Sequence, residues 1–268
     1  MVRCDRPRLG ELALENQGKI IMLTRSHLQI PHPTQPIDSY WVTPKNPVAV
    51  IIVIHEVFGI NDWLKSVCDR LAYEGYAAIA PNMVHRTAPE LNLDYSDESL
   101  ALGRWHKDQM TVAGIEADYR SVVSYLRSLG FKEIGNLGFC FGGHIAFLGA
   151  MQPAILATDV FYGSGIGLLT PGGDGTTMDR SSEIRGRIHL HYGTQDPLIS
   201  NEQTDQVEAA LKQSGVRHQM FRYEAGHGFF CEARSSFDSS AASLAWERVK
   251  EGFAIGLGRG EEAPRIGG

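Results

Sequence analysis

The run from Val48 to Ile54, with the sequence VAVIIVI, constrains the fold of this chain more than any other segment. Seven apolar residues follow one another, and most of them are β-branched, so the segment has strong strand character and no polar face. A strand of this kind is buried on both sides, which is typical of the centre of a parallel sheet. The sequence therefore predicts a sheet that is covered by helices on both faces.

Strands and helices alternate along the rest of the chain. Short apolar runs predict strands over residues 37–42, 76–80, 134–139, 155–161, 187–192 and 219–223. Capping residues and apolar spacings of three and four predict helices over 62–74, 109–129, 140–151, 202–213 and 237–253. Strands that are separated by helices form βαβ crossovers. We therefore expect an α/β fold with a mostly parallel sheet and an irregular, Gly-rich segment over 163–185.

Composition excludes several classes of protein. The 268 residues are 43% apolar and 21% charged, a balance typical of a folded globular chain. The net charge of −6 argues against a nucleic-acid partner. The four cysteines include no C-x-x-C pair, so a disulfide scaffold and a structural zinc site are not expected.

The chain is predicted to consist of an N-terminal extension (1–27), one α/β domain (28–254) and a flexible tail (255–268). The apolar run Ile20–Leu23 is shorter than the roughly 7–15 residues of a signal-peptide core. No stretch approaches the roughly 20 apolar residues of a membrane span. We therefore expect a cytoplasmic protein without a membrane partner, in which a free thiol can persist.

Cys140 carries the strongest chemical signal. It lies in Gly138-Phe139-Cys140-Phe141-Gly142-Gly143, between a predicted strand and a predicted helix. The form G-x-C-x-G is typical of a sharp turn that exposes a nucleophile, since neighbours with a Cβ would clash there. The following N–H groups open the helix and could face a developing anion. The alternative is a buried cysteine in a tightly packed turn.

An acid and a base follow later strands. Asp196, in GTQDP, and His227, in AGHGF, each come directly after a predicted strand. Either residue alone could be an ordinary loop residue. The order nucleophile, acid, base is that of α/β-hydrolases, so we expect a triad of Cys140, Asp196 and His227. His144 could rival His227 as the base, because it lies four residues after Cys140 on the same helix face.

Glu56 and Val57 follow the most buried strand, in the segment HEVFG. A carboxylate at that position is costly unless it has a partner or a task. The alternative is a surface salt bridge. The loop after this strand also supplies an oxyanion-hole donor in α/β-hydrolases, which predicts this role for the backbone N–H near Val57.

Residues 28–254 resemble the dienelactone hydrolases (carboxymethylenebutenolidases), a family of α/β-hydrolases with a cysteine nucleophile. The motifs that carry the resemblance are HEVFG, APNMVHR, GFCFGG, GTQD and AGHGF. The resemblance implies that Cys140 is the nucleophile, Asp196 the orienting acid and His227 the base. It also implies that Glu56 contacts the resting thiol and helps to activate it. The backbone N–H groups of Val57 and Phe141 match the oxyanion hole.

The resemblance further implies that Arg86 binds a substrate carboxylate. The second carboxylate-binding arginine of the best-known members corresponds to Cys231 here, and the nearest arginine is Arg234. Those members commonly have a tyrosine two residues before the arginine that corresponds to Arg86, and this chain has Val84 at that position. No cofactor or metal is implied.

The expected activity is hydrolysis of an ester or lactone through a thioester, acting on a small molecule as a monomer or homodimer. Three alternatives remain: a general carboxylesterase or thioesterase, a binding protein without turnover, and a redox thiol protein that pairs Cys140 with Cys231. His189 and His191 share one strand face and could bind metal. No third ligand has a suitable spacing, which favours two structural histidines.

Overall fold

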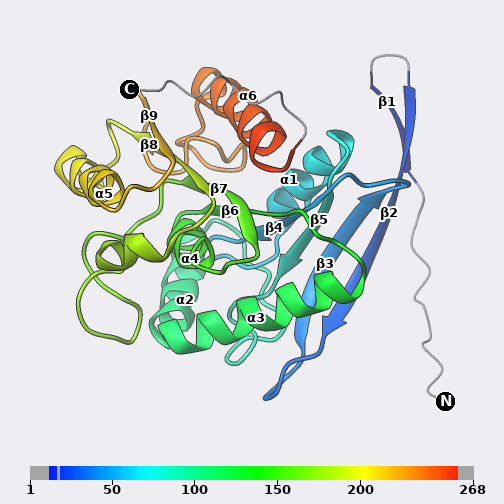
Figure 1. Ribbon diagram of the computed structural model, residues 1–268, viewed down its shortest axis with the longest axis horizontal. Helices are drawn as coiled ribbons and strands as arrows, with labels where there is room; N and C mark the ends of the chain where they lie inside the picture. Colours follow the sequence, from blue (N-terminus) through cyan, green and yellow to red (C-terminus); the bar gives the residue numbers. More distant parts are fainter. Residues whose placement is uncertain (1–11, 17–18, 259–268) are drawn as a thin grey trace.

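The structure of the protein is a computed structural model that describes residues 12–16 and 19–258. Its strands form one sheet in the order β1-β2-β3-β5-β4-β6-β7-β8-β9 (Figure 1). From β5 to β9 all neighbours are parallel, and β1, β2, β3 and β5 pair antiparallel. The strands are β1 (Leu12–Asn16), β2 (Lys19–Ile30), β3 (Ile37–Pro44), β4 (Val50–Ile54), β5 (Ala77–Pro81), β6 (Ile134–Phe139), β7 (Ile155–Phe161), β8 (Arg187–Gly193) and β9 (His218–Tyr223). The predicted α/β fold is confirmed.

The apolar run from Val48 to Ile54 supplies β4, the middle strand of the sheet. All five residues of β4 are buried, and β4 pairs in parallel with β5 on one side and β6 on the other. Helices cover both faces, so no side of this strand meets water. The expectation of a central parallel strand is confirmed.

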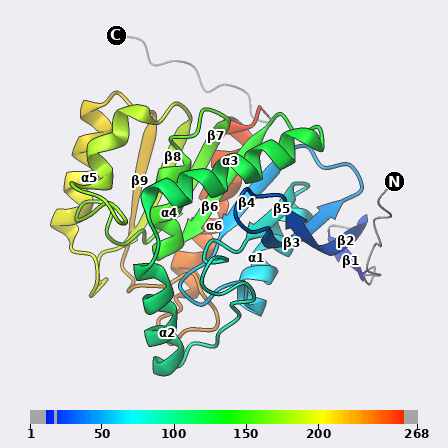
Figure 2. The same ribbon diagram turned by 90° about the horizontal axis from the view of Figure 1, so that it is seen from below.

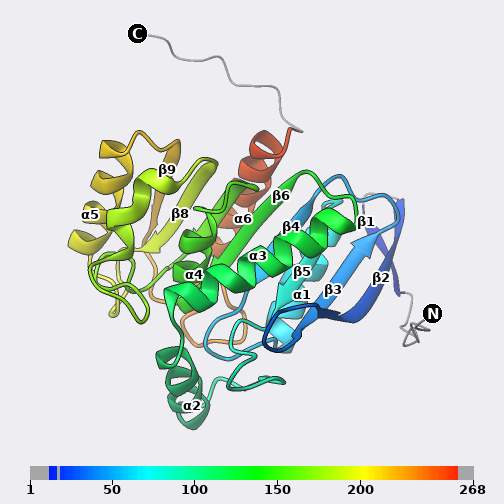
Figure 3. The same cartoon turned by 60° about the horizontal axis from the view of Figure 1, so that its bottom comes forward.

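Helices α1 and α6 cover one face of the sheet, and α3 and α4 cover the other (Figures 2 and 3). Helix α5 packs against β9 at one end of the sheet. Helix α2 projects away from the sheet, below α4 in Figure 3. The helices are α1 (Asp62–Tyr73), α2 (Asp97–Asp108), α3 (Val112–Ser128), α4 (Phe141–Gly149), α5 (Asn201–Gln213) and α6 (Ser239–Gly256). None of the described helices is long and apolar enough to cross a membrane.

Two helical segments of the structure were not predicted from the sequence. Helix α2 was not predicted, because only Gly103 and His106 of its residues are buried and it has almost no apolar stripe. The N-terminal capping residues of α2 do favour a helix start: Ser96 accepts a hydrogen bond from the N–H of Ser99, and acidic residues occupy the first turn. A 3-10 helix, Thr177–Glu183, interrupts the segment that was expected to be irregular.

Both predicted domain boundaries need correction. Strand β2 pairs with β3 from Leu23 to Ile30 and with β1 on its other side, so residues 12–16 and 19–27 belong to the sheet rather than to an extension. Most residues of β2 beyond Ile21 are partly or fully exposed, and the segment therefore lacks the long apolar run of a central strand. At the other end, α6 continues to Gly256 and Leu257 is buried. The rest of the predicted extension and tail (1–11, 17–18 and 259–268) lies outside the described residues.

Candidate active site

Cys140 lies between β6 and α4 in a strained backbone conformation, with φ 55° and ψ −122°. A positive φ is unfavourable for a residue with a Cβ and persists only where the surrounding structure enforces it. The two flanking glycines explain how the turn closes. A Cβ on Gly138 would lie 2.1 Å from the carbonyl oxygen of Gly142, and a Cβ on Gly142 would lie 2.3 Å from that of His55. The predicted sharp turn is therefore present.

Cys140, His227 and Asp196 form a continuous chain of contacts. His227 Nε2 lies 3.1 Å from Cys140 Sγ, and His227 Nδ1 donates to Asp196 Oδ2 at 2.7 Å. The second oxygen of Asp196 accepts the backbone N–H groups of Leu198 and Ile199, at 2.8 and 3.2 Å. These bonds fix the carboxylate, which in turn fixes the tautomer and the orientation of His227. The structure thus brings together the three residues that the sequence placed after three separate strands.

The charge state of His227 follows from its two neighbours. Burial disfavours the charged imidazolium, but the negative charges of Cys140 and Asp196 outweigh this penalty and raise the pKa of His227 to about 10. A protonated imidazole at this position stabilises a negative charge on the neighbouring sulfur of Cys140. A thiolate is the nucleophilic form of cysteine.

Glu56 is buried, with 2% of its surface exposed. Its Oε1 accepts a hydrogen bond from Arg234 Nη1 at 3.0 Å, and its Oε2 is buried without a hydrogen-bond partner. Burial raises the pKa of the Glu56 carboxyl above its usual range, while the charges of Arg234 and His227 act in the opposite direction. The family resemblance led us to expect a contact between Glu56 and the thiol. In this structure the partner of Glu56 is Arg234.

A cavity of about 870 Å³ opens beside Cys140 and His227. Val57 and Phe141 line it, as expected for residues whose backbone N–H groups form an oxyanion hole. Phe141 is the first residue of α4, where N–H groups have no partner within the helix. Helix α2 contributes one wall of the cavity, with the cations Arg104 and Lys107.

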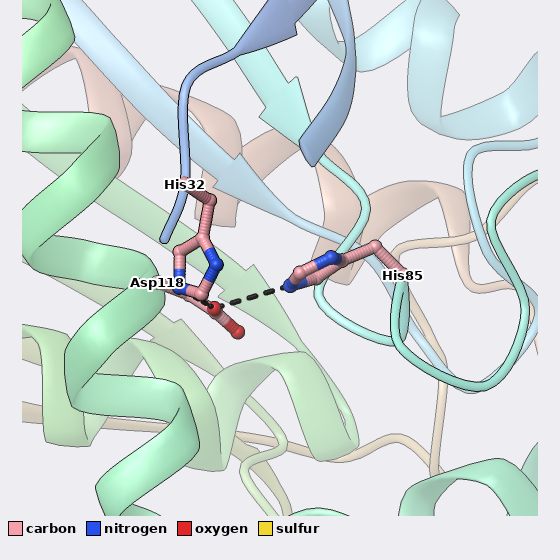
Figure 4. A group of neighbouring side chains, drawn as sticks. All are labelled: His32, His85 and Asp118. Carbon is pink, nitrogen blue, oxygen red and sulfur yellow. Dashed lines mark hydrogen bonds and ion pairs between the residues drawn. The ribbon is translucent and has the colours of Figure 1, made fainter. Parts of the chain in front are cut away.

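Arg86 is not among the residues that line this cavity. Its guanidinium binds Asp118 of α3 with two hydrogen bonds, Nη2 to Oδ1 at 2.6 Å and Nη1 to Oδ2 at 2.9 Å. His32 and His85 lie 3.3 and 3.2 Å from the same Oδ1 (Figure 4). The side chain is thus engaged in a network of its own, and the expected contact between Arg86 and a substrate carboxylate is not supported. The cavity's own cations are Arg104, Lys107 and Arg234, of which the first two were missed because α2 was missed.

Two alternatives from the sequence lose support. Both ring nitrogens of His144 are engaged, Nδ1 with the carbonyl oxygen of Ser164 at 3.0 Å and Nε2 with the hydroxyl of Thr177 at 2.7 Å. Burial lowers the pKa of His144 to about 4, so this residue is a neutral structural group beside the turn. Cys231 is buried, and its thiol donates to the hydroxyl of Tyr95 at 3.2 Å. Burial raises the pKa of Cys231 to about 12, which makes it a poor redox partner for Cys140.

The chain is similar to known proteins over most of its length. The sequence profile of the dienelactone hydrolase family matches residues 37–255. A Synechocystis protein provisionally named carboxymethylenebutenolidase is 39% identical over 234 residues, which covers 85% of this chain and 95% of that protein. A provisionally named carboxymethylenebutenolidase of Saccharolobus solfataricus is 30% identical over 245 residues, covering 80% and 92%.

Solved structures show the same fold. The crystal structure of a provisionally named dienelactone hydrolase from Klebsiella pneumoniae is 27% identical, with a TM-score of 0.79 over 87% of this chain and 98% of that one. A dienelactone hydrolase-like promiscuous phosphotriesterase from metagenomic libraries is 20% identical, with a TM-score of 0.71 over 88% and 99%. This chain belongs to the dienelactone hydrolase family and is a hydrolase that acts on esters or lactones.

Proposed function

We propose that the protein opens its ester or lactone by nucleophilic catalysis at Cys140, through a thioester intermediate. The observation that carries the proposal is the unbroken chain from Cys140 Sγ to His227 and Asp196, at 3.1 and 2.7 Å, at the edge of an 870 Å³ cavity. A nucleophile, a base and a group that orients the base, all within hydrogen-bond reach, define this type of catalysis.

The first half-reaction acylates the thiol. The thiolate of Cys140 attacks the carbonyl carbon, and the oxygen of the tetrahedral intermediate accepts hydrogen bonds from the N–H groups of Val57 and Phe141. The intermediate collapses, the carbon–oxygen bond of the ester breaks, and His227 gives its proton to the leaving alkoxide. The products of this step are an alcohol and a thioester on Cys140; with a lactone, the alcohol stays attached to the acyl group.

The second half-reaction releases the acid. His227, now neutral, takes a proton from water, and the resulting hydroxide attacks the thioester carbonyl. Collapse of this intermediate breaks the carbon–sulfur bond and restores the thiolate of Cys140 and the imidazolium of His227. Asp196 keeps the His227 tautomer correct in both halves.

Glu56 takes a positioning role in this proposal. Its carboxylate holds Arg234, whose guanidinium lines the cavity. Glu56 thereby sets the position of one of the cations that a substrate meets. A general carboxylic ester or thioester would pass through the same steps, so the substrate has to be found with a panel of lactones, esters and thioesters, each with and without a carboxylate.

Trapping the intermediate tests the proposal. Wild-type protein is mixed with a chromogenic ester and quenched in acid, and its mass is measured. We expect an acyl adduct on the peptide that contains Cys140, and neither adduct nor turnover in Cys140→Ala. Cys68→Ala is the matched control, because Cys68 is a buried free thiol outside the cavity. Turnover by Cys140→Ala near the wild-type rate would contradict the proposal, and a wild type that binds esters without turnover would favour a binding protein.

A further inference from the structure

Three buried side chains lie together on the face of the sheet that α6 covers. Asp159 of β7 pairs in parallel register with His189 of β8, and His191 follows two residues later on the same face. All three are at most 3% exposed, and none lines the active-site cavity. Helix α6 lies directly over them, since a Cβ on Gly252 would be 2.6 Å from His189 Nδ1.

The three side chains converge on one point. His191 Nε2 lies 2.9 Å from Asp159 Oδ1, and His189 Nδ1 lies 3.5 Å from the same oxygen. One ligand atom from each residue lies within 4.8 Å of the other two. The two distances to Asp159 Oδ1, 2.9 and 3.5 Å, lie near the roughly 3.4 Å that separates two ligand atoms bound tetrahedrally at about 2.1 Å from one ion.

His189 is the feature that a structural role leaves unexplained. Both of its ring nitrogens are buried and neither makes a hydrogen bond of good geometry, although Nδ1 lies at an ion-pair distance of 3.5 Å from Asp159 Oδ1. An unpartnered polar group in a protein interior is costly and rare. By contrast, His191 Nδ1 lies 2.8 Å from the hydroxyl of Tyr223, a contact that fixes the ring with Nε2 toward Asp159. Metal-binding histidines are commonly oriented by such a bond at the other nitrogen.

We propose that Asp159, His189 and His191 bind a divalent transition-metal ion, with Zn²⁺ as the best fit. Two imidazoles and one carboxylate are a donor set that Zn²⁺ accepts. The ion gives His189 Nδ1 a direct ligand bond in place of its 3.5 Å contact with Asp159, and it links β7 to β8 beneath α6. Because the site is closed, the metal binds as the chain folds, and its effect is on stability rather than on ester hydrolysis.

The charge around the cluster permits this ion. One cation close to the cluster is Arg248 of α6, whose guanidinium lies 4.3 Å from the ring centroid of Phe221 and 5.1 Å from that of Tyr223. Within the described residues Arg248 forms no ion pair with Asp159, so the carboxylate charge is left for the metal. The cluster of His32, His85 and Asp118 has the same three residue types, but there both carboxylate oxygens already bind Arg86. That cluster is therefore a matched control.

The test measures zinc in protein that has folded in its presence. Cys140→Ala is the parent, so that the active-site thiol cannot contribute a ligand. The full-length parent is produced in zinc-supplemented medium, dialysed against metal-free buffer and analysed by mass spectrometry for metals. We expect one Zn²⁺ per chain in the parent, loss of at least nine-tenths of it in His189→Gln, and no change in His85→Gln.

Three outcomes would overturn the site: a parent without zinc, a folded His189→Gln variant with unchanged zinc, or a His85→Gln variant that loses zinc equally. If His189→Gln does not fold, the site is tested instead by producing the parent in medium with Co²⁺ and recording the visible absorption spectrum of the bound ion. The proposal requires visible absorption bands of Co²⁺ bound by nitrogen and oxygen, without a thiolate charge-transfer band. Absence of bound cobalt, or the presence of a thiolate band, contradicts it.

Discussion

The proposed triad and the network around Arg86 both pair a carboxylate with a histidine, but of the two only the triad places its histidine beside a thiol. In the network, Asp118 accepts two hydrogen bonds from Arg86, whose positive charge neutralises the carboxylate. His85 is a further partner of the same carboxylate. In the triad, Asp196 is held by backbone N–H groups and leaves its second oxygen for His227. The far nitrogen of His227 faces a thiol at a cavity, whereas that of His85 is buried without a partner. A histidine–carboxylate pair is thus reactive where its free nitrogen meets a nucleophile and no cation neutralises the acid.

The same substitution in both regions gives the largest expected contrast. Asp196→Asn should keep the geometry but favour the wrong tautomer of His227, and should reduce kcat by up to ~10⁴-fold, as in serine triads. Steady-state hydrolysis of a chromogenic ester measures the loss. Asp118→Asn is the matched control and should keep kcat within about threefold, far from that precedent. Equal losses in the two variants would show that the two regions are not functionally distinct.

The free energy of unfolding should respond in the opposite order to kcat, with the larger loss in Asp118→Asn. Asp118→Asn leaves the guanidinium of Arg86 without its anion, and breaking a buried pair in this way costs about 3 kcal/mol of unfolding free energy. We take the low end of the usual range because the side chain of Arg86 is 35% exposed. Urea denaturation measures the change. A loss below 1 kcal/mol, well under that range, would mean that the network adds little to the fold.

Removing a cation should distinguish the two regions by a smaller factor, seen in the KM for a negatively charged ester. Arg104 and Lys107 line the cavity and Arg86 does not. Arg104 is exposed and Lys107 half-buried, and an exposed ion pair contributes up to about 1 kcal/mol, so Arg104→Ala or Lys107→Ala should raise KM for a carboxylated ester by up to about fivefold. Arg86→Ala should leave KM unchanged. A neutral ester of the same size is the control, and a rise in KM for Arg86→Ala on the anionic ester alone would restore Arg86 to the site.

The smallest expected effect is in the pH profile. Acylation requires protonated His227 as the acid, and its pKa is raised to about 10. The protonated form is therefore present at neutral pH and is lost as pH rises through about 10, so kcat/KM should stay level up to pH 9 and then fall. Asp196→Asn removes one cause of the raised pKa and should move this fall to lower pH, whereas Asp118→Asn should not. Profiles that coincide in all three proteins would contradict the assignment of the alkaline limb to His227.

The sequence by itself determined the central strand, the alternation of strands and helices from β3 onward except for α2, and the turn at Cys140. These features depend on neighbouring residues: β-branched runs make buried strands, and glycines permit a sharp turn. The positions of Asp196 and His227 after strands were also readable, because the carboxyl ends of parallel strands meet at one edge of the sheet. A local pattern is sufficient for each of these inferences.

Only the tertiary structure decided which distant side chains meet. Arg86 follows β5 in a segment that matches the family motif, but α3 places Asp118 against its guanidinium, and Arg86 is not among the residues that line the cavity. Nothing in the sequence indicates that Asp159 lies next to His189 and His191. It meets them because β7 and β8 are neighbouring strands and pair Asp159 with His189. Helix α2 forms a cavity wall without an apolar stripe of its own. Such contacts join segments far apart in the chain, so they depend on strand order and helix packing rather than on local residue preference.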